Sequence, residues 1–212
     1  MRQVHKNISI LVVALLAISL YACKKDNYLT DGGTHTATTP YTTYDYMAAN
    51  SFQVFDTVLA IIDHYGLKDS VNKAGTFFAP TDYSVNRLMN SLQVDNMDDL
   101  YTKISSRFIT QYLFSDTAIT LQNAGTTPKI YNNWADTIAG VKKQAYTYGV
   151  VSSNLTYYVL QYVKINGYLD GDAGAPNDDP TDAVLNCQTT GIITSTATRL
   201  QVLSNASSLA AK

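Results

Sequence analysis

The first half of the chain carries apolar residues at the spacing of α-helices. Asn50 is placed to cap a helix that Gly66 would end in a left-handed conformation. The apolar residues that recur on one face of this helix are Val54, Val58, Ile61 and Ile62. A second helix is predicted to begin at Thr81 or Asp82, and a third to span about residues 98–113.

Segments with the sequence pattern of β-strands lie mainly in the second half of the chain. Residues 75–82 predict a short buried strand that ends at Pro80, because proline cannot donate to a β-ladder. After Phe114 the chain becomes rich in Thr, Tyr, Val and Ile, which are typical of strands. The strands predicted there cover residues 118–121, 129–131, 145–151, 155–165 and 198–203. Because helices come first and antiparallel strands follow, the pattern indicates the α+β class.

The N-terminus has the pattern of an export signal. Arg2 and Lys6 precede an apolar run over residues 8–20, which is short for a membrane span of about 20 residues. A positive start followed by a short apolar run is typical of a secretory signal peptide, here predicted over residues 1–22. The sequence LYAC that ends at Cys23 resembles a bacterial lipobox, and this resemblance implies cleavage before Cys23 and its lipidation. An ordinary signal peptide followed by an incidental cysteine is the alternative.

The rest of the chain divides by composition. Residues 23–43 contain a run of Gly and Thr and predict a flexible linker behind the lipid. The periodic segments then define one domain over residues 44–205, and residues 206–212 are left as a C-terminal tail.

Composition narrows the chemistry that this domain could perform. The chain has 3 His and 2 Cys, and all of its 17 acidic residues are Asp. Zinc sites and Ser/His/Asp triads need well-placed His or Cys residues, so this scarcity argues against an enzyme and no cofactor is expected. The formal net charge of −2 argues against nucleic acid as a partner.

Three blocks of the domain resemble the fasciclin-like family, in the order in which that family has them. They are FQVFDTVLAIIDHYGLKDSV, TFFAPTDYSVNRL and TGIITSTATRLQVLS. The second block is the most specific, and the residues that match the family's first signature are Phe78, Ala79, Pro80, Thr81 and Asp82. The resemblance implies a fasciclin-like fold, with N-terminal helices packed on a twisted, largely antiparallel sheet or wedge. It also implies a role in adhesion.

The chain departs from the family pattern at three positions. Ala197 stands where the family usually has Gly, and Gln201 stands where it usually has His. Leu113 follows Tyr112 where the family has a Tyr-His pair. In the family these histidines are thought to matter for packing and adhesion contacts. Leu and Gln are plausible substitutes in a half-buried layer, so the chain is interpreted as a divergent member that keeps the fold.

Aromatic residues are the first candidates for a binding surface. Strand alternation puts Tyr157 on one face of the sheet, and Tyr158 and Tyr162 on the other. Exposed tyrosines suit contacts with proteins and sugars, because an apolar ring carries a polar tip. The alternative is that they are ordinary half-buried residues of the sheet. Trp134 lies in a polar segment, where it would either anchor a ligand or close the edge of the sheet.

An acidic loop is the second candidate site. Asp170 and Asp172 alternate with glycine, and Asp178 follows in the same loop. Alternating carboxylates are what an oxygen-ligand calcium site needs, although Gly174 occupies the next ligand position and no Glu follows. A solvated loop is the alternative to calcium binding.

These observations favour a non-enzymatic, lipid-anchored binding module in cell-surface adhesion or protein–protein interaction. The alternative is an accessory glycan-binding lipoprotein of a nutrient-capture system. The lipid on Cys23 would attach it to the outer membrane of a Gram-negative bacterium, and the charged residues after Cys23 resemble surface-export signals. The expected partners are therefore the membrane and an extracellular protein or glycan.

Overall fold

A seven-stranded sheet organises the domain in the computed structural model, which describes residues 37–117, 119–150 and 153–209. The strand order is β2-β1-β7-β6-β5-β4-β3. The strands are β1 Thr76–Ala79, β2 Leu113–Phe114, β3 Lys129–Asn132, β4 Ile138–Val150, β5 Ser153–Lys164, β6 Ala183–Ile193 and β7 Arg199–Leu203. Neighbouring strands are antiparallel except β1 and β7, which run parallel. Cys23 and the predicted signal peptide lie outside the described residues.

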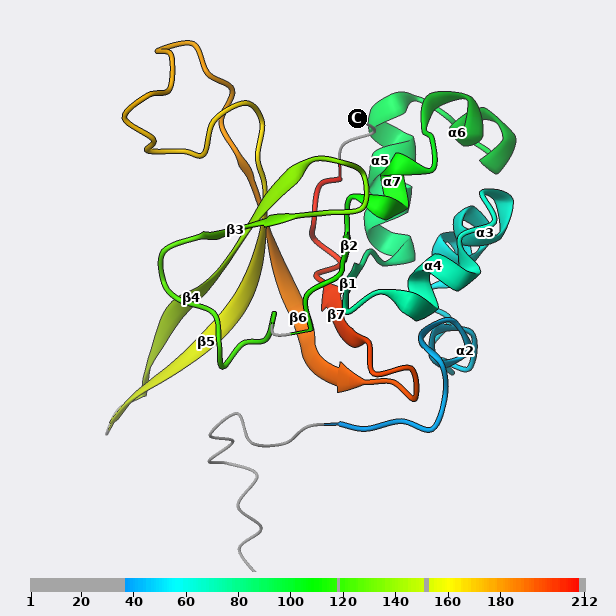
Figure 1. The fold of residues 1–212 in the computed structure, drawn as a ribbon, viewed down its shortest axis with the longest axis horizontal. Helices are drawn as coiled ribbons and strands as arrows, with labels where there is room; N and C mark the ends of the chain where they lie inside the picture. The colour runs from blue at the N-terminus through cyan, green and yellow to red at the C-terminus, as the bar shows by residue number, and fades with distance from the viewer. Residues whose placement is uncertain (1–36, 118, 151–152, 210–212) are drawn as a thin grey trace, which may run out of the picture. The chain divides into compact units, whose positions relative to one another are not determined.

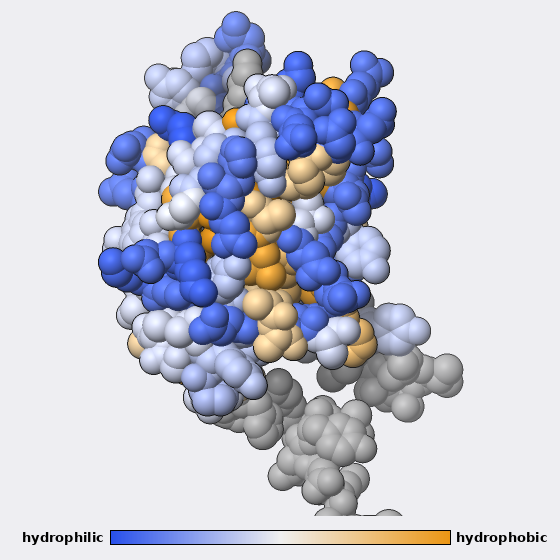
Figure 2. Space-filling model, turned by 90° about the vertical axis from the view of Figure 1, so that its right-hand side faces the viewer, coloured by the Kyte–Doolittle hydropathy of each residue, from blue (hydrophilic) through white to orange (hydrophobic). Residues whose placement is uncertain are grey.

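The helices gather beside the β1–β7 end of this sheet (Figure 1). They are α2 Thr43–Ala48, α3 Asp56–His64, α4 Lys68–Lys73, α5 Asp82–Leu92, α6 Met97–Lys103 and α7 Arg107–Thr110. The α+β class predicted from the sequence is therefore confirmed. No helix among the described residues combines the length and the apolar character needed to cross a membrane. The outer side of the helices shows hydrophilic residues around a narrow apolar strip (Figure 2).

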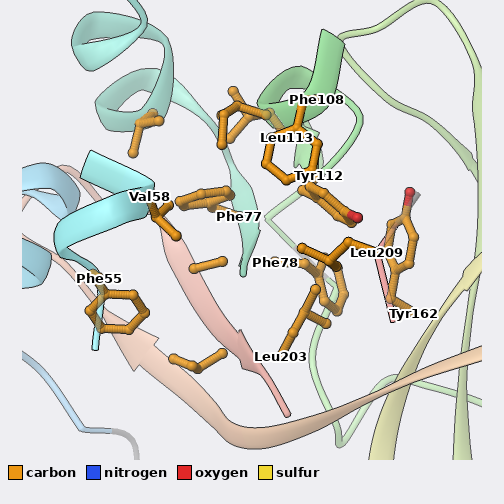
Figure 3. Close-up of a cluster of buried hydrophobic side chains, with 14 of the residues drawn as sticks. Phe55, Val58, Phe77, Phe78, Phe108, Tyr112, Leu113, Tyr162, Leu203 and Leu209 are labelled. Carbon is orange, nitrogen blue, oxygen red and sulfur yellow. The ribbon is translucent and has the colours of Figure 1, made fainter. Parts of the chain in front are cut away.

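The core lies between these helices and the sheet (Figure 3). Strand β1 is buried along its whole length, as the sequence predicted, and it ends before Pro80. Phe78 packs against Phe114 and Tyr162, with ring centroids 5.7 and 5.5 Å apart. Several aromatic side chains of this cluster have no more than 1% of their surface exposed. Their burial supplies much of the free energy that holds helices and sheet together.

The helix after Pro80 follows the sequence prediction closely. Thr81 is extended and precedes α5, and the Ser84 hydroxyl accepts the Thr81 N–H at 3.0 Å. Val85 and Leu88 are buried on the inner face. Local capping and apolar periodicity agree here, so sequence alone locates the helix.

The first predicted helix begins later than expected. Asn50 accepts the Phe52 N–H within a turn, and α3 begins only at Asp56. The N-terminal N–H groups of α3 are instead taken by Asp82, whose carboxylate accepts from Thr57 at 2.9 Å and from Val58 at 3.2 Å. A cap supplied from another helix by tertiary contact has no local sequence signal. Desolvation raises the pKa of the Asp82 carboxyl despite these hydrogen bonds.

The third predicted helix, over residues 98–113, is wrong as one helix. It is divided into α6 and α7 by Ile104, which is extended. The Tyr65 hydroxyl donates to the Ile104 carbonyl at 3.0 Å, and the Ser105 hydroxyl accepts the Arg107 N–H at 3.3 Å. These bonds offer the backbone an alternative to continuing the helix. The chain then enters β2 at Leu113.

Three errors concern strands. Strand β4 begins at Ile138, whereas the sequence predicted its start at residue 145. The strand predicted over residues 118–121 is wrong, because Ile119 is irregular and a bend and a turn follow at Thr120 and Leu121. Strand β6 was missed, since the pairing of β6 with β7 shifts register after Cys187 and again after Thr189. These irregularities interrupt the alternation of buried and exposed residues that marks a strand.

Both ends of the described chain contact the domain. Thr39, in the predicted linker, donates its N–H to the Ile193 carbonyl of β6 at 2.9 Å. In the predicted tail, Ser207 and Leu209 are buried.

Candidate functional site

The paired strands β4 and β5 form a long hairpin that extends away from the helices, towards the lower left in Figure 1. Tyr146 lies opposite Tyr157 across the two strands, and their rings stack with centroids 5.6 Å apart at 19°. Tyr148 shares this face by strand alternation. The opposite face carries Tyr158, with the Lys143 ammonium 5.2 Å from its ring centroid. We call these four tyrosines the tyrosine hairpin.

The tyrosine hairpin is accessible to solvent. The exposed fraction is 37% for Tyr146, 66% for Tyr148, 50% for Tyr157 and 48% for Tyr158. Large rings exposed together on neighbouring strands are a feature of binding surfaces, since folding alone does not require them there.

Tyr162 is a correction to the predicted surface. Its position on the same face as Tyr158 is as predicted, but only 1% of it is exposed, because that part of β5 lies over the core. Its hydroxyl donates to the Gln111 carbonyl at 3.1 Å, and burial raises its pKa. Strand alternation identifies a face but does not reveal where along the strand the covering layer begins.

Trp134 is partly buried and packs against the core. Its indole N–H donates to the Ser115 hydroxyl at 2.9 Å, and its backbone N–H donates to the Leu113 carbonyl at 3.0 Å. Of the two roles left open by the sequence, these contacts favour closing the edge of the sheet over anchoring a ligand.

The acidic loop uses its carboxylates to hold its own backbone. Asp170 and Asp182 each accept a backbone N–H from the other residue. Asp172 accepts from Gly174 at 2.9 Å, and Asp179 accepts from Tyr168. Among the described residues, no three or more His, Cys or acidic side chains are grouped so that they could hold a metal ion. The arrangement favours the solvated loop over a calcium site formed by Asp170, Asp172 and Asp178.

The second and third blocks of the family resemblance lie side by side. Strand β1 carries Phe78 and Ala79, and it pairs with β7 so that Phe78 is opposite Gln201. Pro80 and Thr81 are buried directly after β1, and Asp82 provides the cap of α3 described above. All these signature residues thus have structural roles at the centre of the domain.

Gln201 is completely buried and makes hydrogen bonds at both ends of its amide. Its Nε2 donates to the Ile119 carbonyl at 3.1 Å, and its Oε1 accepts the Gly191 N–H at 2.9 Å. A neutral histidine also offers one donor and one acceptor, so glutamine can replace it in this position.

A cleft separates α6 and α7 from β4 and β5, and the sequence analysis did not identify it. Its volume is about 570 Å³, within the range of roughly 300–1,000 Å³ that is usual for small-molecule sites. Phe108 and Tyr162, both labelled in Figure 3, lie against it from the core side. Lys103, Arg107 and Lys164 line it from three different elements. Because Lys164 is far from Lys103 and Arg107 in sequence, only the fold brings the three to one place.

Comparison with known proteins adds no assignment. No model of a protein family matches the chain, and no curated protein is significantly similar to it.

Proposed function

We propose that this chain is a lipid-anchored binding module of the cell envelope, built on a divergent fasciclin-like domain. It acts in cell-surface adhesion or protein–protein interaction, by contact and not by catalysis. The observation that carries the proposal is the tyrosine hairpin, in which four exposed tyrosines lie on two neighbouring strands that project from the domain. Tyrosine contributes large contact areas at interfaces with little loss of conformational entropy.

Two features support the fasciclin-like part of the proposal. The blocks that resemble the family's first and last signatures pair as β1 and β7. Ala197, which stands in place of the family's usual glycine, has a φ of 64°. This is a conformation that glycine adopts readily and alanine does not. A family that usually has glycine here would therefore be expected to share this turn.

A glycan-binding role in nutrient capture is the second candidate. The nearly parallel rings of Tyr146 and Tyr157 favour it, because exposed aromatic rings also stack on sugars.

The experiment measures binding of the full chain, in detergent, to immobilised matrix proteins and to a glycan array. We expect binding to a matrix protein that is lost in the double variant Tyr146→Ser/Tyr157→Ser. Tyr83→Ser is the matched control, since Tyr83 is 56% exposed but lies on α5. Equal binding by the double variant would exclude the tyrosine hairpin as the contact surface, and binding to sugars alone would favour the second candidate.

The proposed anchor is tested separately. The variant Cys23→Ala should move the protein from the membrane fraction to the soluble fraction, because one diacylated or triacylated cysteine supplies the chains needed for stable attachment. Retention of the variant in membranes would contradict lipidation at Cys23.

A further inference from the structure

The cleft beside α6 and α7 concentrates positive charge in a chain that is negative overall. Three basic side chains line it, namely Lys103 at the end of α6, Arg107 at the start of α7 and Lys164 at the end of β5. The chain has 17 acidic residues against 15 Lys and Arg, yet no carboxylate lines this cleft.

The charges of Lys103 and Arg107 are not neutralised locally. Neither has an acidic oxygen within 4.0 Å in the described part of the chain, where the recorded ion pair is Lys68 with Asp45. Like charges that share a cleft repel one another, and a bound anion would turn this repulsion into attraction. Desolvation lowers the pKa of Lys164, because burial disfavours the charged form of its ammonium group.

The remaining lining is suited to a ring that carries hydroxyl groups. Ile138, 44% of which is exposed, gives the cleft apolar surface, and Ile104 and Phe108 also line it although they are buried. Thr137 and Asn166 add polar groups to the lining. A sugar has an apolar C–H face and polar edges, whereas inorganic phosphate has no apolar face to use this surface. Combined with the basic residues, the lining fits a sugar with a carboxylate.

We propose that this cleft binds an acidic saccharide, with Lys103, Arg107 and Lys164 around the carboxylate of a uronic acid unit. Arg107 can make two parallel hydrogen bonds to a carboxylate, and the lysines add charge. The site is distinct from the tyrosine hairpin and does not depend on the function proposed for it.

The test is calorimetric titration of the full chain, in detergent, with short oligomers of galacturonate, glucuronate and mannuronate. The methyl esters of the same oligomers keep the shape of the sugar and remove its charge. We expect at least one acidic oligomer to bind, its ester to bind about tenfold more weakly or worse, and the affinity to fall as salt is raised.

Variants locate the binding. Lys103→Gln/Arg107→Gln should weaken it by about tenfold or more, while Arg107→Lys should retain part of it. The control Lys73→Gln/Arg87→Gln removes two charges from exposed residues outside the cleft and should leave the affinity unchanged. The variant Tyr146→Ser/Tyr157→Ser should also bind normally, which separates this site from the hairpin.

Three results with the unmodified chain would overturn the proposal. They are the absence of binding by every acidic oligomer at millimolar concentration, equal binding of acid and ester, and binding of inorganic phosphate as tight as that of the best oligomer. Normal affinity in the Lys103→Gln/Arg107→Gln variant would place the site elsewhere and would equally refute it.

Discussion

The two ends of the sheet differ in what covers them. At the β1–β7 end, helices cover the strands and every residue of β1 is buried. Along the outer part of β4 and β5, the hairpin projects away from the helices and its tyrosines are exposed (Figure 1). Aromatic residues are abundant at both ends, so their number does not distinguish them. Aromatic residues therefore stabilise the fold where helices cover them, and they are available for binding where nothing in the domain covers them.

The largest expected effect contrasts one aromatic residue from each end. Phe78→Ala removes a ring that contacts two other rings in the core and should lower the free energy of unfolding by about 4 kcal/mol. Tyr157→Ala removes a half-exposed ring and should cost about 1 kcal/mol or less. Urea unfolding of both variants, followed by circular dichroism, measures the two losses. Similar losses would mean that the hairpin is part of the cooperative core, and the contrast between the two ends would be lost.

Elements with local signals were the ones that the sequence could predict. The α5 helix has both a cap at Thr81 and an apolar face through Val85 and Leu88. Strand β1 is a short apolar run ended by Pro80. In both cases the information lies within a few residues, and the tertiary structure does not override it.

Features set by contacts between distant residues could not be predicted. The interruption at Ile104 depends on the hydroxyl of Tyr65, and the start of α3 depends on Asp82. For the tyrosine hairpin, alternation predicted the faces correctly, but the depth of the core decides that Tyr158 is exposed and Tyr162 is buried. The basic cleft had no sequence signal at all, since Lys103 and Lys164 are isolated lysines until the fold joins them.

A second prediction sharpens the role of polar contacts at the covered end. Gln201→Leu leaves the Gly191 N–H and the Ile119 carbonyl without their partner inside the protein, and should cost about 3 kcal/mol. Gln201→His restores the residue usual in the resembled family and keeps one donor and one acceptor, so it should cost only about 1 kcal/mol. Thermal unfolding of the two variants measures the difference. If histidine is as damaging as leucine, the proposed equivalence with the family position fails.

The smallest expected effect concerns the turn that joins β6 to β7. Ala197 has a φ of 64°, and its N–H donates to the Thr194 carbonyl at 2.9 Å. The left-handed conformation costs a non-glycine residue roughly 1–2 kcal/mol, and glycine loses roughly 0.5–1 kcal/mol more conformational freedom on folding. Ala197→Gly should therefore stabilise the domain by about 0.5 kcal/mol in urea unfolding.

A matched control decides whether this gain comes from the backbone of the turn. Ala173 is also exposed but is not among the residues with positive φ, so Ala173→Gly should destabilise the domain by about 0.5 kcal/mol through unfolded-chain entropy alone. Opposite signs for the two substitutions would support a glycine-type turn between β6 and β7, as the family resemblance implies. Destabilisation by both would show that alanine fits this turn without strain, and Ala197 would no longer support the fasciclin-like assignment.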